Sequence, residues 1–128
     1  MRYRLMDILA CPICKNFPLK LYPFEQEELK ITEVPKNTCE LFCAYKNIKL
    51  ENLEKSSLLQ ECTKCLAYNI KWGIIVCGKC GRWYPISDDI PVMLPDEMRK
   101  AEDDINFLKM FEKKIPDDVL KNGKPHHL

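Results

Sequence analysis

Eight cysteines in a chain of 128 residues constrain the fold more than any other feature, because they fall into four closely spaced pairs. Thiolate sulfur is a preferred zinc ligand, and four thiolates complete a tetrahedral shell. Pairs that lie far apart along the chain therefore predict a small protein in which a metal ion joins distant segments. The pairs are Cys11 and Cys14, Cys39 and Cys43, Cys62 and Cys65, and Cys77 and Cys80.

The outer two pairs have the form of zinc knuckles. Pro12 lies between the first two cysteines, and glycines accompany the last two in the run CGKCG at 77–81. Each pair lies beside a predicted strand, which is the usual arrangement of a zinc ribbon. Buried free thiols and a redox pair are the alternatives, but a thioredoxin-like pair needs a βαβ context, whereas these flanks indicate hairpins. We predict a Zn²⁺ ion bound by Cys11, Cys14, Cys77 and Cys80.

The inner two pairs allow several interpretations. Cys39 and Cys43 are four residues apart and would share one face of a helix. Cys62 and Cys65 have knuckle spacing, but no glycine supports either turn. We expect all four to form one cluster, which would bind a second metal ion or form disulfides. Partly buried free thiols are the remaining alternative.

Composition narrows the class of protein. Apolar residues make up 46% of the chain and charged residues 30%, which is typical of a soluble folded domain. The net charge of +1 disfavours a domain that binds nucleic acid by itself. Asp7 and Pro12 interrupt the apolar run that a secretory signal requires, and no apolar stretch is long enough to span a membrane. We therefore expect a cytoplasmic protein, where clustered cysteines bind metal more often than they form disulfides, except in hyperthermophiles.

Hydrophobic periodicity predicts both strands and helices. Strands are predicted over 17–22, 29–34, 70–76 and 83–86, with a charged loop before residue 29. A turn is predicted at 87–89, followed by a short apolar run over 90–94. Helices are predicted over 38–48, where Leu41, Tyr45 and Ile48 form a stripe, and over 51–61 and 96–114. The last dozen residues are polar and expected to be loose.

Nothing in the sequence indicates catalysis. The only histidines are His126 and His127, near the end of the chain, and four glycines provide no phosphate-binding loop. A zinc ion held by four thiolates has no open position for water or substrate. We therefore expect that the protein is not an enzyme.

Several separated motifs resemble one known family. They are MDILACPICK at 6–15, CGKC at 77–80, YPI at 84–86 and IPVML at 90–94. Together they resemble the small zinc-binding methyltransferase activator subunit, a family of archaea and eukaryotes with shorter bacterial relatives. The resemblance covers residues 1–22 and 73–98. The chain departs from the family pattern at Asp89, where a glycine is common, in its inner cysteines, and in the predicted helix after residue 95.

The resemblance implies an α+β fold. Residues 1–24 and 70–95 would form a zinc-ribbon-like domain, 25–69 an inserted and mainly helical subdomain, and 96–128 a C-terminal helix and tail. The family's zinc ligands fall on the outer cysteines. Its members are non-catalytic subunits that activate and stabilise S-adenosylmethionine-dependent methyltransferases acting on tRNA, rRNA or a translation release factor. The implied partner is the catalytic subunit, in a heterodimer, with RNA reached only through that partner and no membrane involved.

An apolar surface beside the metal is the expected docking site. The run 90–94 is almost entirely apolar, and so small a domain cannot easily bury all of it. The family docks partly by adding a strand to the catalytic subunit. The alternatives are a zinc-ribbon nucleic-acid or transcription-factor module, in which Trp83 and Tyr84 would stack on bases, and a thiol-disulfide or metal-trafficking protein. The predicted contact residues are Leu5, Ile8, Leu9, Trp83, Ile86, Ile90, Pro91, Val92, Met93 and Leu94.

Overall fold

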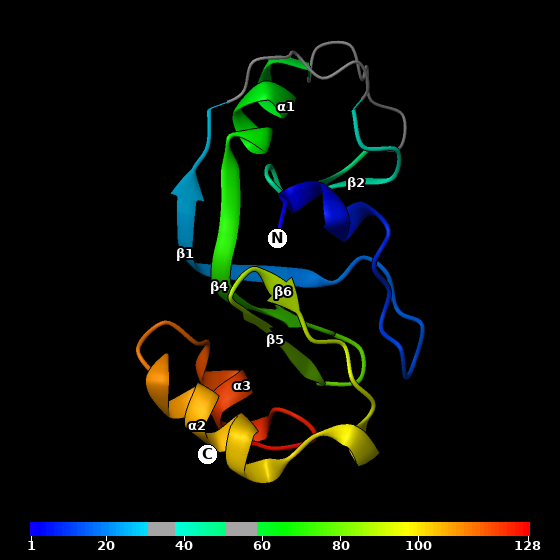
Figure 1. Cartoon of the computed structure of the whole chain (residues 1–128). Coiled ribbons are helices and arrows are strands. Elements are labelled where there is room, and N and C mark those ends of the chain that lie inside the picture. Colours follow the sequence, from blue (N-terminus) through cyan, green and yellow to red (C-terminus); the bar gives the residue numbers. More distant parts are fainter. Residues whose placement is uncertain (31–37, 51–58) are drawn as a thin grey trace.

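A four-stranded antiparallel sheet forms the centre of the computed structural model, which describes residues 1–30, 38–50 and 59–128 (Figure 1). Its spatial order is β1-β4-β5-β6, so β6 lies at one edge. The strands are β1 (Lys20–Glu28), β4 (Tyr68–Val76), β5 (Trp83–Ser87) and β6 (Ile90–Pro91). The predicted α+β class is confirmed.

Smaller elements lie on both sides of the sheet (Figure 1). On one side are the 3₁₀ helix η1 (Tyr3–Asp7), the hairpin of β2 (Phe42–Cys43) and β3 (Ile48–Lys49), and the helix α1 (Leu59–Leu66). On the other are η3 (Asp96–Met98), α2 (Ala101–Met110) and α3 (Asp117–Asn122). Within the described ranges no helix is long and apolar enough to cross a membrane.

The sheet separates two hydrophobic cores because its central strands are buried on both faces. Ile75 and Tyr84 contribute to the core under η1, while their neighbours Ile74 and Trp83 contribute to the core under α2. This follows from the alternation of side chains along a strand. The first core also contains Met1, Tyr3, Met6, Leu19, Phe42 and Ile70, and the second contains Phe107, Leu108, Phe111, Ile115 and Val119.

A tight turn joins β5 to β6. Asp88 and Asp89 both have positive φ, 47° and 64°, which matches the two-residue hairpin turn that follows strand twist. Aspartate tolerates this conformation better than most residues, so the turn forms without a glycine. The N–H of Asp89 also donates to the carbonyl of Lys71 on β4 at 2.9 Å.

The charged loop predicted before residue 29 is wrong. β1 extends through this region, and its last residue, Glu28, pairs with Tyr68 on β4. The strand predicted at 29–34 lies mostly outside the described residues, and so does most of the helix predicted at 51–61.

The helix predicted at 38–48 is replaced by the β2–β3 hairpin. The carboxylate of Asp7 accepts backbone N–H groups of Glu40, Leu41 and Phe42 at 2.7–2.9 Å. A side chain from η1 therefore binds the backbone N–H groups at the start of the hairpin. Between β1 and β4 the described residues thus form a hairpin and one helix, where a mainly helical unit was expected.

The single helix predicted at 96–114 is divided. Arg99 and Lys100 are extended, with ψ of 130° and 124°, so η3 ends before α2 begins. The extended backbone directs Arg99 into the second core, where it is only 8% exposed. Its guanidinium donates to the carbonyl of Trp83 at 2.7 Å, pairs with Asp104 at 2.9 Å and lies 4.6 Å from the centre of the Trp83 ring.

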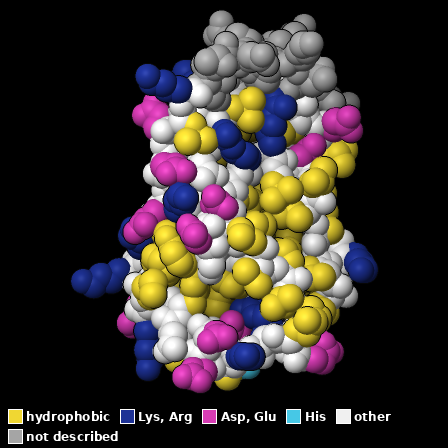
Figure 2. All heavy atoms as spheres, viewed as in Figure 1, with side chains coloured by type: hydrophobic (Ala, Val, Ile, Leu, Met, Phe, Trp, Pro, Cys, Tyr) yellow, Lys and Arg dark blue, Asp and Glu magenta, His cyan; other side chains and the backbone are white. Residues whose placement is uncertain are grey.

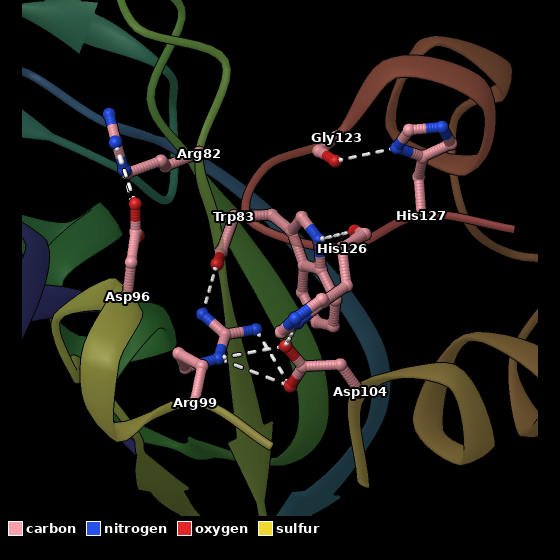
Figure 3. Close-up of polar contacts among 8 residues, drawn as sticks. All are labelled: Arg82, Trp83, Asp96, Arg99, Asp104, Gly123, His126 and His127. Carbon is pink, nitrogen blue, oxygen red and sulfur yellow. Dashed lines mark hydrogen bonds and ion pairs between the residues drawn. The ribbon is translucent and has the colours of Figure 1, made fainter. Parts of the chain in front are cut away.

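The C-terminal residues, expected to be loose, pack against the sheet instead (Figure 3). The N–H of Trp83 donates to the carbonyl of Lys124 at 3.1 Å, and its indole N–H donates to the carbonyl of His126 at 2.9 Å. The His126 ring lies 2.7 Å from the Asp104 carboxylate. Backbone and side-chain contacts therefore hold the end of the chain beside β5.

Loss of the Arg99 charge should destabilise the fold. Arg99→Met leaves the buried Asp104 without its guanidinium partner, which costs about 3–5 kcal/mol in comparable cases. The double variant Arg99→Met with Asp104→Leu should recover most of that loss. Urea unfolding in excess zinc measures both values. The control is Lys64→Met, because the Lys64 side chain is 66% exposed and its pair with Glu61 should contribute less than about 1 kcal/mol. Equal losses of unfolding free energy in Arg99→Met and Lys64→Met would contradict a stabilising role for the buried pair of Arg99 and Asp104.

Candidate metal centre

The first knuckle is closed by two backbone hydrogen bonds. The N–H of Cys11 donates to the carbonyl of Asn16 at 3.0 Å, and the N–H of Lys15 donates to the carbonyl of Cys11 at 2.9 Å. Lys15 has a φ of 65°, in the left-handed region that favours glycine. This turn wraps the chain so that both thiols of the pair face the same point.

The second knuckle repeats this pattern. The N–H of Cys77 donates to the carbonyl of Arg82 at 2.8 Å, and the N–H of Gly81 donates to the carbonyl of Cys77 at 3.0 Å. Gly81, with a φ of 77°, occupies the position that Lys15 takes in the first knuckle. Of the two glycines singled out in the sequence, Gly81 is therefore the one that the turn requires.

The two knuckles bring their four thiols together. Cys11 Sγ lies 3.6 Å from Cys80 Sγ, and Cys14 Sγ lies 3.5 Å from Cys77 Sγ. All four sulfur atoms lie within 4.8 Å of one another. A tetrahedral zinc site with Zn–S bonds of about 2.3 Å has sulfur atoms about 3.8 Å apart. The cluster therefore suits Zn²⁺. Four thiolates would occupy all four coordination positions of the ion and leave none for a substrate.

Hydrogen bonds favour the thiolate form at one ligand of each pair. Burial raises the pKa of Cys11, but the N–H of Cys14 and the Tyr84 hydroxyl more than offset this, and the pKa falls to about 6. Burial also raises the pKa of Cys77, and the N–H groups of Cys80 and Lys79 bring it below its ordinary value. Zinc binds deprotonated cysteine, so these N–H groups prepare two ligands for the metal.

Cys14 differs from Cys11, the other ligand of its pair. The N–H of Asn16 lowers the pKa of Cys14, but burial and the neighbouring thiols of Cys77 and Cys11 raise it to about 11. Thiolates this close repel one another. A bound divalent cation removes that repulsion and deprotonates coordinating thiols.

Two residues outside the motif support the centre. The buried Tyr84 hydroxyl lies 3.3 Å from Cys11 Sγ, and burial, followed by the hydrogen bond to Cys11, raises the pKa of Tyr84, which keeps the hydroxyl protonated as a donor. Arg82 forms paired hydrogen bonds to Asp96 at 2.9 and 2.8 Å, and hydrogen bonds to Asp96 and Cys80 raise its pKa. Its positive charge would partly balance four thiolates around a bound metal ion. Neither role was predicted from the sequence, where the only signal is the position of these residues directly after the second knuckle.

The inner cysteines line one small cavity of about 10 Å³. Cys39 precedes the hairpin and Cys43 lies in β2, while Cys62 and Cys65 lie on α1. All eight cysteines of the chain are unpaired thiols, so the disulfide alternative is absent from this structure. Among the described residues only the outer four form a group of thiols within 4.8 Å of one another, so no three of the inner sulfur atoms are that close together.

Burial keeps two of the inner thiols protonated. It raises the pKa of Cys39 to about 11, with a further contribution from Asp7, and the pKa of Cys65 to about 12, with a further contribution from Cys43. The charge of Arg4 opposes the rise at both positions.

The predicted contact residues fall into two groups. Trp83 and Ile86 are fully buried, so their prediction as partner contacts is wrong. The Trp83 ring stacks on Phe107 at 5.8 Å and contacts Arg99, while Ile86 lies in the first core. The others reach the surface, where Figure 2 shows hydrophobic side chains gathered over the region of η1 and β6. Ile8 and Ile90 are exposed, and Leu5, Leu9, Pro91, Val92, Met93 and Leu94 are half-buried.

These features define a zinc-ribbon-like protein, in which two knuckles bring four thiols together beside an antiparallel sheet. Among known families, the Trm112p-like protein family matches residues 2–89, which include both knuckles. The chain therefore belongs to the Trm112p-like family, and the resemblance drawn from the motifs is confirmed. A comparison with curated proteins finds no match. The family match ends before β6, α2 and α3.

Removal of one outer ligand should remove a metal ion and unfold the protein. Metal binding supplies on the order of 10 kcal/mol of folding free energy in zinc-finger peptides. Cys77→Ser should therefore lose one equivalent of zinc, measured by elemental analysis, and its circular dichroism should show loss of the fold. Lys79→Ser is the matched control, because Lys79 is an exposed residue of the same knuckle. A well-folded wild type with less than one zinc would refute the site.

The Tyr84 hydroxyl should contribute to metal affinity. Tyr84→Phe keeps the buried ring and removes only the donor to Cys11, so the affinity for zinc should fall about 10–100-fold, as for other groups that bond a ligand. Competition against a chromophoric chelator measures this affinity. Tyr22→Phe serves as the control, because Tyr22 packs against the other core. Unchanged affinity in Tyr84→Phe would show that the hydroxyl does not support the metal.

Proposed function

We propose that this protein is a non-catalytic subunit that activates and stabilises S-adenosylmethionine-dependent methyltransferases acting on tRNA, rRNA or a translation release factor. Membership of the Trm112p-like family supports this role. The observation that carries it is an apolar surface around an edge strand, directly beside the four-cysteine cluster. We call it the docking surface; it comprises Leu5, Ile8, Leu9, Ile90, Pro91, Val92, Met93 and Leu94.

The backbone of the docking surface suits strand addition. β6 lies at the edge of the sheet, and the N–H of Val92 donates inward to the carbonyl of Pro85 at 2.8 Å. Because backbone groups alternate along a strand, those of Pro91 and Met93 face the opposite way, toward the open edge. Pro91 has no N–H, so it can only accept a hydrogen bond there. A strand of the catalytic subunit could therefore pair along this edge.

The side chains of the docking surface supply the apolar contact. Ile8 is 75% exposed and Ile90 is 61% exposed, and burial of such a side chain contributes about 1.5–3 kcal/mol. Three partly buried side chains pack against the core that contains the buried thiol of Cys11; they are Leu5, Leu9 and Met93. The metal centre thus holds the docking surface in shape, and a partner that covers it would remove a hydrophobic patch from water on both subunits.

Other observations agree with a role in binding. A closed four-thiolate site has no position for chemistry. The burial of Trp83 and Tyr84 removes the aromatic pair that the nucleic-acid alternative would use for stacking. With a net charge of +1, the chain would reach RNA only through its partner.

Charge on the docking surface should abolish the complex. Ile90→Asp and Val92→Asp each place a carboxylate in the contact, where its desolvation would be uncompensated. Each variant should fail to co-purify with a methyltransferase that is co-expressed with it, while zinc content and the fold remain intact. Co-expression with candidate tRNA, rRNA and release-factor methyltransferases provides the measurement.

Met110→Asp is the matched control, because Met110 is 68% exposed but lies on α2, across the sheet. It should bind and activate like wild type. If Ile90→Asp and Val92→Asp also do so, the docking surface is elsewhere. If no methyltransferase co-purifies with wild type, the proposed function is wrong.

A further inference from the structure

We propose that Cys39, Cys43, Cys62 and Cys65 bind a second Zn²⁺ ion. The four thiols come from two separate parts of the insertion. Cys62 and Cys65 lie three residues apart on α1 and therefore share one face of that helix. Both are buried, at 8% and 6% exposure. Cys39 and Cys43 reach the same cavity from the hairpin side.

The size and lining of the cavity match a single ion. Its volume of about 10 Å³ is close to that of one water-sized sphere, which is room for a single ion. Four of its eight lining residues are the cysteines. The others are Arg4, Thr38, Leu50 and Glu61. Four thiols around an atom-sized space are the donor set that tetrahedral zinc prefers.

Charges around the cavity are compatible with a tetrathiolate. Four thiolates and one Zn²⁺ carry a net charge of −2, which Arg4 would partly balance from the cavity wall. The carboxylate of Glu61 is held by Lys46 at 3.4 Å and Lys64 at 3.8 Å. Asp7, which also acts on Cys39, accepts three backbone N–H groups. Both nearby acids therefore have partners of their own.

The local structure gives the second metal a physical task. The hairpin strands are two residues long each, and α1 has eight residues, so neither element would be stable alone. An ion shared between them would join hairpin to helix, as the outer ion joins the two knuckles. Binding would bring all four sulfur atoms to about 3.8 Å from one another, the edge of a zinc tetrahedron.

The test is the zinc content of the full-length chain, purified in reducing conditions from zinc-supplemented medium. Wild type should contain two equivalents of zinc, and Cys62→Ser with Cys65→Ser should contain one. The matched control Lys64→Ser, at an exposed position of the same helix, should retain both equivalents. If a variant fails to fold, Co²⁺ titration of the metal-free wild type decides the question. The visible bands of tetrahedral thiolate cobalt should then saturate at two equivalents.

Thiol counting separates the other outcomes. Wild type purified without reductant, then denatured with chelator, should show eight reactive thiols. One equivalent of zinc with eight thiols means that the inner cysteines are free and overturns the proposal. Four to six thiols mean one or two disulfides and also overturn it. None of these outcomes depends on methyltransferase binding, so this inference and the proposed function fail separately.

Discussion

The convergence of two knuckles on one point is the constraint on which the rest of the structure depends. Cys11 and Cys14 belong to the first segment of the chain, and Cys77 and Cys80 follow β4. Once these thiols meet, the segment containing η1 must lie across the sheet. Its side chains Met1, Tyr3 and Met6 then close the first core. The same segment carries Ile8, so the convergence of the knuckles positions both a core and part of the proposed docking surface.

The two faces of the sheet are stabilised by different means. The first relies on thiols and short elements, which bury few side chains by themselves. The second relies on aromatic packing, with Phe107 at 5.1 Å from Phe111 and Trp83 stacked beneath α2. Buried Arg99 and Asp104 tie α2 to β5. The helices of this second core lie beyond the family match, which ends at residue 89, whereas the strands β4 and β5 that they cover lie within it.

Short sequence patterns predicted those parts of the fold that depend on residues close together in the chain. The outer knuckles, the strands at 70–76 and 83–86 and the turn before Ile90 follow from residue spacing, apolar runs and turn residues. The hairpin at 42–49 was missed because Leu41, Tyr45 and Ile48 are also compatible with a helix, and Asp7, more than thirty residues away, binds the backbone that a helix would use. The packed tail was missed because its contacts are mainly backbone hydrogen bonds to Gly81 and Trp83, which leave no apolar pattern.

The same reasoning explains why the candidate site was only partly predicted. Ligand identity depends on cysteine spacing, which is visible in the sequence, but burial depends on which face of a strand a residue occupies. Trp83 and Ile86 follow the second knuckle in the sequence, yet both point into a core, whereas Ile90 follows the turn and points to solvent. Alternation alone cannot assign faces to β5, because both of its faces are covered. Of the apolar residues on β5 and β6, which follow the second knuckle, those on the edge strand β6 are therefore the ones that reach the surface.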